Sequence, residues 1–214
     1  MFEYALWGVL WFQRSFDRAL AHQRQRVWKI YPQRAASDFR IGVMGLGEIG
    51  GYIATRLAGL GYHVSGWARS EKQLPGVRCY HGDAQAGEFF AELDALINVL
   101  PLTEQTRGIL ARPLLDRLPA GAVLINCGRG EHMVNHDILQ ALDSGRLAGA
   151  VLDVFPVEPL PQDDPLWLHP QVVITPHMAS IAPAEVIARQ LLENIHRQQR
   201  ALPLNNLVDK QRGY

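Results

Sequence analysis

The side chains best suited to chemistry in this sequence are Arg129 in INCGRG, Asp153 and Glu158 in VLDVFPVEP, and His177 in ITPH. An arginine can hold a carboxylate through two parallel hydrogen bonds, and a histidine can give a proton to an oxygen that becomes an alkoxide. A carboxylate such as Glu158 beside the histidine would favour the charged imidazolium. The set therefore suits proton transfer during reduction of a carbonyl group that stands next to a carboxylate.

Such a reduction needs an electron donor, and the stretch MGLGEIGG predicts where one binds. Gly45, Gly47 and Gly50 fit G-x-G-x-x-G after an apolar run at 39–44. Apolar residues then recur at helical spacing, at Ile49, Ile53, Leu57 and Leu60. In such a turn the first glycine permits the bend, the second lets the backbone approach a pyrophosphate, and the third lets the helix pack on the strand. We expect a dinucleotide with its phosphates at the helix N-terminus, and a left-handed helix stop at Gly61.

The end of the next expected strand, GWARS, indicates which dinucleotide this is. Ala68 stands where an acid would bind the hydroxyls of an adenosine ribose, and Arg69 and Ser70 follow it. A guanidinium and a hydroxyl suit a 2′-phosphate, so the stretch favours NADP over NAD. The alternative interpretation makes Arg69 an ordinary surface arginine after a strand.

Strands and helices alternate from residue 39 onward, which predicts a parallel α/β sheet of the doubly wound, Rossmann type. The expected strands lie near 39–44, 63–67, 77–80, 95–99, 122–126, 149–153 and 172–174. In this fold ligands bind at the carboxyl ends of the strands, so the four polar residues should meet on the edge that carries the glycine turn.

Helices are expected to flank this sheet at both ends of the chain. Residues 3–26 contain no proline and predict one long helix, while 182–200 predict a final helix with Pro183 in its first turn and a tail at 201–214. We therefore divide the chain into a helix and arm at 1–36, a dinucleotide-binding domain at 37–181, and a C-terminal helix and tail at 182–214.

Composition excludes several classes of protein. Lys+Arg and Asp+Glu are equal at 21 each, so no net charge attracts nucleic acid or an anionic membrane. The basic stretch from Arg14 to Arg34 could be a nucleic-acid patch, but a solvated helix face is the simpler interpretation. No apolar run is long enough to span a membrane, and Cys79 and Cys127 form no paired motif. A soluble cytoplasmic protein is expected.

Other chemical possibilities are weaker. His132 and His136 have the four-residue spacing of a zinc site on a helix, but Asn135 resembles the N-cap of HDILQALDSG, which puts His132 before the helix. We therefore expect no metal. Cys127 could be a nucleophile, yet no base is evident near it in the sequence, so an apolar filler role is favoured.

The motifs GLGEIG, LPLTEQT, INCGRG, AVLDVFPVEPLP and ITPHMAS together resemble, in order and spacing, the D-isomer-specific 2-hydroxyacid dehydrogenases. Within that family, PLW, HP and the closing RGY are most similar to the bacterial glyoxylate/hydroxypyruvate reductases of the A type. The resemblance covers the whole chain. It implies NADPH-dependent reduction of a small 2-keto acid, such as glyoxylate or hydroxypyruvate, to the 2-hydroxy acid.

The resemblance also assigns roles to residues. It implies that the catalytic residues are Arg129, Glu158 and His177, and that Asp153 contacts the nicotinamide carboxamide. The stretch MFEYALWGVLWF is implied to link two domains and to pack across a homodimer. The full set of expected cofactor contacts is Gly45, Leu46, Gly47, Glu48, Ile49, Gly50, Trp67, Arg69, Ser70, Leu100, Pro101, Thr106, Asn126, Cys127, Gly128, Asp153 and Ala179.

One departure from the family concerns the start of the chain. In the family most of the substrate domain precedes the linking helix, whereas this sequence begins at that helix. An internal methionine taken as the start, a deliberate fragment and a proteolytic fragment all remain open. A cofactor-binding module without turnover, as in corepressors that share this fold, is the rival to an active enzyme.

Overall fold

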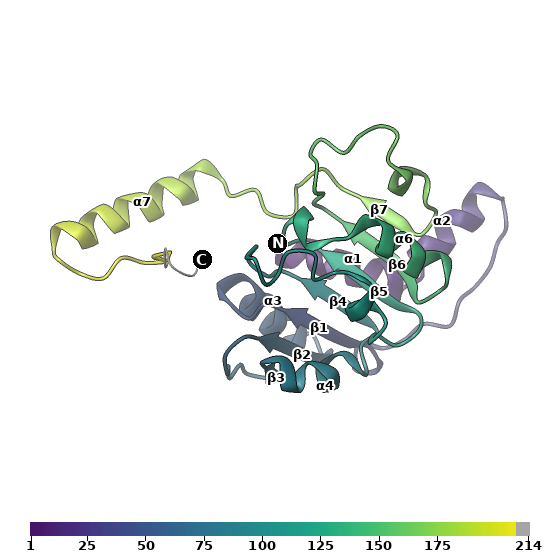
Figure 1. The fold of residues 1–214 in the computed structure, drawn as a ribbon, viewed down its shortest axis with the longest axis horizontal. Coiled ribbons are helices and arrows are strands. Elements are labelled where there is room, and N and C mark those ends of the chain that lie inside the picture. Colours follow the sequence, from purple (N-terminus) through teal and green to yellow (C-terminus); the bar gives the residue numbers. More distant parts are fainter. Residues whose placement is uncertain (209–214) are drawn as a thin grey trace. The chain divides into compact units, whose positions relative to one another are not determined.

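The computed structural model describes residues 1–208 of the 214, and within them seven parallel strands form one sheet in the order β3-β2-β1-β4-β5-β6-β7 (Figure 1). Each strand coincides, within two residues at either end, with an expected one. The strands are β1 Arg40–Met44, β2 His63–Ala68, β3 Val77–His81, β4 Ala95–Asn98, β5 Ala122–Asn126, β6 Leu147–Leu152 and β7 Val172–Ile174. The strand order reverses beside β1, as the doubly wound prediction requires.

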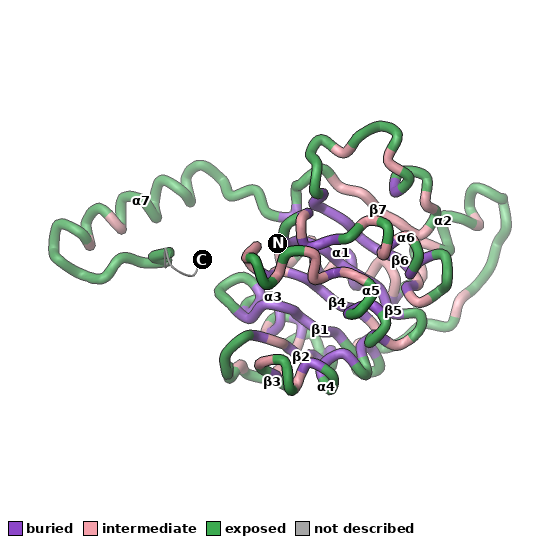
Figure 2. The backbone as a smooth tube through the Cα atoms, in the orientation of Figure 1, coloured by how far each residue is buried: buried purple, intermediate pink, exposed green. Residues whose placement is uncertain are grey.

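Helices cover both faces of the sheet. The α-helices in the same part of the chain as the sheet are α1 Phe2–Gln13, α2 Phe16–Arg24, α3 Glu48–Gly59, α4 Ala86–Phe90, α5 Arg112–Leu115 and α6 Asn135–Asp143. A last helix, α7 Ala184–Gln199, lies in a separate unit. One apolar cluster joins α1 and α3 to the sheet through residues such as Val43 and Ile125. A second joins α4, α5 and α6 to it through residues such as Leu96 and Leu124. Alternating strand residues therefore face two separate cores, and Figure 2 shows burial concentrated on the strands between them.

The single helix expected over 3–26 is wrong, because the chain turns between α1 and α2. Ser15 has a left-handed backbone with φ 57°. The last residue of α1, Gln13, is buried and fixed by its side chain, which donates to the Arg34 carbonyl at 3.0 Å and accepts from the Tyr62 hydroxyl at 2.6 Å. Sequence periodicity does not reveal these hydrogen bonds of Gln13, so it could not predict that α1 ends at this residue. The following helix α2 buries none of its residues.

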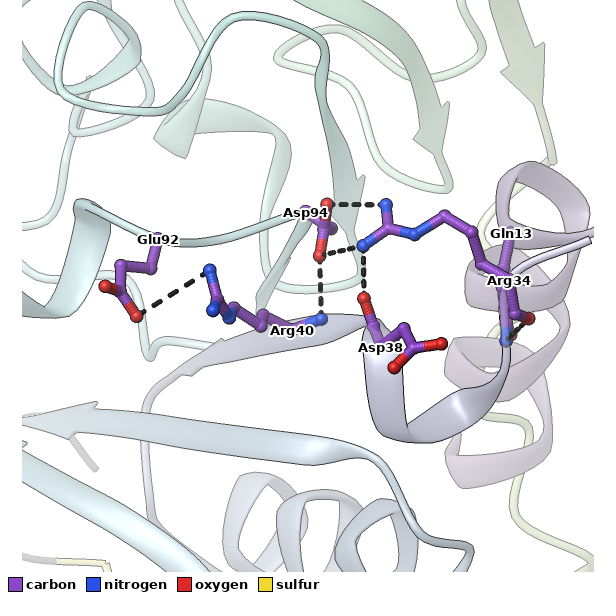
Figure 3. A network of polar contacts seen from close by, with 6 residues as sticks. All are labelled: Gln13, Arg34, Asp38, Arg40, Glu92 and Asp94. Atoms are coloured by element: carbon purple, nitrogen blue, oxygen red, sulfur yellow. Dashed lines mark hydrogen bonds and ion pairs between the residues drawn. The ribbon is translucent and has the colours of Figure 1, made fainter.

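The segment after α2 is tied to the start of β1 and β4 by a polar network (Figure 3). Arg34 forms two hydrogen bonds with the Asp94 carboxylate, at 2.7 and 2.9 Å, and also donates to the Asp38 carbonyl. Asp94 in turn accepts from the Arg40 backbone N–H at 2.8 Å. A bidentate arginine–carboxylate pair fixes orientation as well as distance, so it sets the path by which the arm enters the sheet.

Three details of the helices can be compared with the sequence expectation. Gly61 has φ +88° just after α3, which confirms the left-handed stop. Ile53 and Leu57 of that helix are buried, but Ile49 and Leu60 are half exposed. The N-cap expected at Asn135 is wrong, because α6 begins at that residue and Val134 precedes it as the cap. The Val134 N–H bonds the Leu110 carbonyl, which holds the chain extended up to this point.

The chain divides into two compact units, and the second begins at Ser180. Its helix α7 starts at Ala184, so Pro183 is the N-cap and not part of the first turn as expected. Apolar side chains of α7 are solvent-exposed, among them Ile187, Leu191, Leu192 and Ile195. The tail expected at 201–214 is described only to residue 208, and the closing RGY lies outside the described residues. No helix in the described part of the chain has the length and apolar character to cross a membrane.

Candidate active site

The turn between β1 and α3 has the geometry that the three glycines predict. Gly45 has φ +99°, which permits the bend. A Cβ on Gly50 would stand 1.7 Å from the Gly45 carbonyl oxygen, so only glycine lets α3 pack this closely. A Cβ on Gly47 would meet no atom within 4 Å, so the N-cap of α3 is open on that side. This cradle fits a pyrophosphate, which the first N–H groups of α3 and its dipole would attract.

The other residues expected around this turn differ in how they are placed. Leu46 is buried and lies over Gly66 of β2, whereas Glu48 and Ile49 are exposed in the first turn of α3. Trp67 donates its indole N–H to the Gly82 carbonyl at 2.9 Å, which ties the end of β2 to that of β3.

Arg69 and Ser70 are exposed directly after β2. Glu71 follows them and is also exposed, a carboxylate that sequence reasoning left out. Because Glu71 is a charged residue close to Arg69 in the sequence, its substitution can serve as the control for substitution of Arg69.

The loops after β4 and β5 bring the middle group of expected cofactor contacts together. Thr106 donates its hydroxyl to the Pro101 carbonyl at 2.7 Å and so closes the loop after β4. Leu100, Asn126 and Cys127 are buried below this edge. Burial raises the pKa of the Cys127 thiol, so it stays protonated and is a poor nucleophile, in accord with the expected filler role.

His177 and Glu158 form the pair that the sequence predicted. The His177 Nδ1 atom lies 2.8 Å from Glu158 Oε2, and Glu158 Oε1 accepts the Phe155 N–H at 2.9 Å. The carboxylate thus holds one ring nitrogen and leaves Nε2 as the other proton-carrying position. His177 has φ +52°, a backbone conformation that non-glycine residues rarely adopt and that often marks functional positions.

Asp153 shapes the turn that carries His177. It is buried, and its carboxylate accepts from the Thr175 hydroxyl at 2.6 Å and from the N–H groups of Met178 and Ala179, both at 2.9 Å. Its backbone carbonyl accepts the His177 N–H at 2.8 Å. Asp153 therefore forms hydrogen bonds with the turn on both sides of His177, a role that the sequence did not indicate.

A second contact that sequence reasoning missed reaches this turn from α1. The Tyr4 hydroxyl lies 2.5 Å from Thr175 Oγ1. Since the Thr175 hydroxyl proton goes to Asp153, Tyr4 is the donor in this contact. The first helix is therefore linked to the His177 turn through two hydroxyls.

Arg129 follows β5 and is exposed. Its Nη1 donates to the Gly128 carbonyl at 2.8 Å. The flanking glycines explain how the residue reaches the edge of the sheet. A Cβ on Gly130 would stand 1.9 Å from the Phe155 carbonyl carbon, so this glycine lets the segments that follow β5 and β6 contact each other. The backbone beside Arg129 is therefore tightly packed, while the residue itself is exposed.

The pKa of Glu158 gives a direct test of its contact with His177. Partial burial opposes ionisation of Glu158, but hydrogen bonds from His177 and the Phe155 N–H outweigh it and lower its pKa below 4.5. The ionised pair therefore stabilises the folded state at pH values above the ordinary pKa of a glutamate. This stabilisation is lost as the pH falls through the lowered pKa of Glu158. Because the side chain is 37% exposed, solvent screens the effect and makes it small.

We expect ¹³C NMR titration to find the pKa of the Glu158 carboxyl below its ordinary value and to find that pKa raised in His177→Ala. Replacement of the exposed His136 by alanine is the control and should leave the titration unchanged. An identical Glu158 titration in His177→Ala would contradict the pairing.

The zinc hypothesis finds no geometric support, because His132 lies in the short 3-10 helix Gly130–His132 and its ring nitrogens contact Asn98, Arg129 and Pro101. Among the described residues, no group of three or more His, Cys, Asp or Glu side chains is arranged to hold a metal ion.

The glycine turn at β1 and the histidine–glutamate pair beyond β6 and β7 lie on the carboxyl edge of one parallel sheet. This arrangement defines a dinucleotide-binding oxidoreductase. The family model for the NAD binding domain of D-isomer specific 2-hydroxyacid dehydrogenases matches residues 6–179. The chain belongs to this family.

Relatives support the assignment along the whole chain. A glyoxylate/hydroxypyruvate reductase A from Salmonella newport is 44% identical, with 100% of this chain and 69% of the relative covered. A D-isomer specific 2-hydroxyacid dehydrogenase family protein from Klebsiella pneumoniae 342 is 78% identical with TM-score 0.94, covering 98% of this chain and 68% of that one. The NADPH-dependent glyoxylate/hydroxypyruvate reductase of Sinorhizobium meliloti, solved with NADP and sulfate, is 37% identical with TM-score 0.96, covering 100% and 69%.

Proposed function

We propose that this chain carries the cofactor-binding part of an NADPH-dependent reductase that converts glyoxylate or hydroxypyruvate to the 2-hydroxy acid. The observation that carries the proposal is the 2.8 Å contact between His177 and Glu158 on the edge that also holds the glycine turn. The named activity of the Salmonella and Sinorhizobium relatives supports the choice of substrate.

Each catalytic side chain has a separate task in this proposal. Arg129 binds the carboxylate of the keto acid by paired hydrogen bonds, and its contact with the Gly128 carbonyl limits the rotation of the guanidinium. Glu158 holds Nδ1 of His177, so that Nε2 gives its proton to the C2 oxygen of the substrate. Asp153 keeps the turn of His177 in place, and we also propose that it contacts the nicotinamide carboxamide.

The cofactor is NADPH, which supplies the hydride when it is bound. The open side of Gly47 and the N-terminus of α3 would receive the pyrophosphate. Arg69 and Ser70 would receive the 2′-phosphate. The loops at Pro101 and Gly128 would line the nicotinamide half.

The test is NADPH binding by fluorescence together with NADPH consumption in the presence of each acid. Measurements are made on this chain and on a form extended by the substrate-domain segment that precedes the linking helix in the family. Arg129→Ala should bind NADPH normally but lose saturation by either acid. Equal turnover with Arg129→Ala would contradict the proposal.

Cofactor preference is expected to depend on Arg69. NADPH should bind more tightly than NADH, and Arg69→Ala should reduce the preference by about ten- to a hundredfold, the value of one charge-assisted hydrogen bond. Glu71→Gln is the matched control, since it changes a neighbouring charge without removing the guanidinium. Fluorescence titration with both cofactors measures the ratio, and a preference unaffected by Arg69→Ala would rule out the assignment.

A second candidate, a cofactor-binding module without turnover, is favoured by the exposure of the site. The side chains of His177 and Glu158 are 50% and 37% exposed, and Arg129 is exposed as well. Solvent at these positions weakens each electrostatic contact that the reaction needs.

We also propose a homodimer formed through residues 3–31. The arm after α2 exposes Trp28 to 95% and Ile30 to 84%, and such apolar surface is typical of an interface. Sedimentation should give twice 23.9 kDa, and Trp28→Ser with Ile30→Ser should give a monomer. Leu168→Ser is the control, because Leu168 is 90% exposed outside this arm. A monomeric parent chain at micromolar concentration would contradict the proposal.

The domain limits and the cellular location belong to the same proposal. We assign residues 1–36 to the dimer arm, 37–181 to the cofactor domain and 182–214 to the C-terminal helix and tail. A cytoplasmic location fits the two cysteines, Cys79 and Cys127, both of which are thiols that form no disulfide.

A further inference from the structure

His132 is a fully buried titratable residue that the proposed reaction does not use. It ends the 3-10 helix Gly130–His132, and its exposed fraction is 0%. Nδ1 lies 3.1 Å from the Arg129 backbone nitrogen and 2.9 Å from the Asn98 side-chain amide nitrogen. Nε2 lies 3.3 Å from the Pro101 carbonyl oxygen.

These partners permit one protonation state of the ring. A backbone N–H and an amide NH₂ can only donate, so Nδ1 must accept from both, and a carbonyl can only accept, so Nε2 must carry the proton. The ring is therefore neutral with its hydrogen on Nε2. Burial lowers the pKa of His132, which acts in the same direction.

The imidazole joins two loops that border the site. Pro101 belongs to the loop after β4, and Arg129 follows β5. Asn98 also donates to Asn126 at 2.9 Å, and the Asn126 side-chain amide donates to the Arg129 carbonyl at 3.4 Å. Both backbone polar groups of Arg129 are thus held by buried side chains.

The backbone before Arg129 packs closely against the His132 ring. A Cβ on Gly128 would lie 2.8 Å from His132 Nδ1 and 2.8 Å from the Asn98 amide nitrogen. The glycine that precedes Arg129 is thus required for the imidazole to reach the arginine backbone.

We propose that His132 is a positioning residue for Arg129: its neutral ring fixes the Arg129 backbone against the Pro101 loop and so presents the exposed guanidinium in one place. The proposal rests on the proposed function in assigning the substrate carboxylate to Arg129. A guanidinium on a long side chain binds a small anion efficiently when its backbone origin is fixed, since less freedom is lost on binding.

Two substitutions of His132 distinguish the role of Nδ1, which accepts hydrogen bonds, from that of Nε2, which donates one. In His132→Asn the side-chain oxygen can replace Nδ1, whereas in His132→Gln the longer amide can replace only Nε2. We expect the Arg129 amide proton of this chain to be protected from hydrogen exchange, to remain protected in His132→Asn, and to lose protection in His132→Gln. His136→Gln, at an exposed position on α6, is the control.

The kinetic measurement uses the extended form with NADPH and glyoxylate. His132→Gln should raise KM by about tenfold, the value of one hydrogen bond, with a smaller change in kcat, and His132→Asn should restore KM. A merely structural role would lower the active fraction and leave KM unchanged. An unprotected Arg129 amide in the parent chain, or an unchanged KM in His132→Gln, would overturn the proposal.

A ¹⁵N NMR spectrum of the parent chain decides the matter if the glutamine variant fails to fold. A proton on Nε2 supports the proposal, and a proton on Nδ1 at neutral pH overturns it. Failure of the proposed function would look different, because neither acid would be reduced by any form while the exchange and tautomer results still stood.

Discussion

Replacing His177 by alanine is expected to lower kcat for glyoxylate by about 10²–10⁴-fold in the extended form, the usual contribution of a positioned general acid. The reason is geometric: Glu158 holds Nδ1 at 2.8 Å, so the ring offers Nε2 to the substrate oxygen in a fixed orientation. Alanine removes the proton donor and leaves the glycine turn intact, so the affinity for NADPH should stay the same.

Single-turnover measurement of NADPH consumption separates this loss from any change in product release. His136→Ala, at an exposed histidine of α6, should retain the parental rate. Near-normal kcat in His177→Ala would require another acid on this edge. An intermediate loss in Thr175→Val, with recovery in Thr175→Ser, would show that the turn itself must be held by Asp153 and Tyr4.

The sheet could be predicted from the sequence because its signals are local. Each buried strand is a short apolar run between turns, and the glycine turn needs three glycines at a fixed spacing. Parallel strands place all their carboxyl ends on one edge, so His177 and Glu158 could be expected together without knowledge of any contact. Their pairing follows from topology and from the alternation of elements.

The contacts that position these residues could not be predicted in the same way. Tyr4 and Thr175 are 171 residues apart, and no periodicity links a tyrosine in the first helix to a threonine after the last strand. His132 was considered as a metal ligand, because sequence spacing says nothing about which nitrogen a backbone N–H will approach. The exposure of Arg129 could not be predicted either, since two flanking glycines indicate a close backbone approach but not where the side chain lies.

The exposure of the three side chains proposed as catalytic, Arg129, Glu158 and His177, leads to the second large effect. We expect this 214-residue chain to bind NADPH and yet to reduce glyoxylate and hydroxypyruvate poorly. The cofactor contacts that we propose, at the turn Gly45–Gly50, at Arg69 and in the loops after β4 and β5, all belong to the first compact unit.

Catalysis places a stricter demand on the same surface. A small keto acid must be held against the nicotinamide from both sides, and a displacement of about 1 Å can cost on the order of a hundredfold in rate. With His177 50% and Glu158 37% exposed, water also weakens the hold of Arg129 on a carboxylate and the coupling within the pair. Steady-state NADPH consumption by this chain should therefore fall at least about a hundredfold below that of the extended form, at equal affinity for NADPH. Comparable kcat/KM values in the two forms would show that the carboxyl edge of the sheet in this chain is sufficient for turnover.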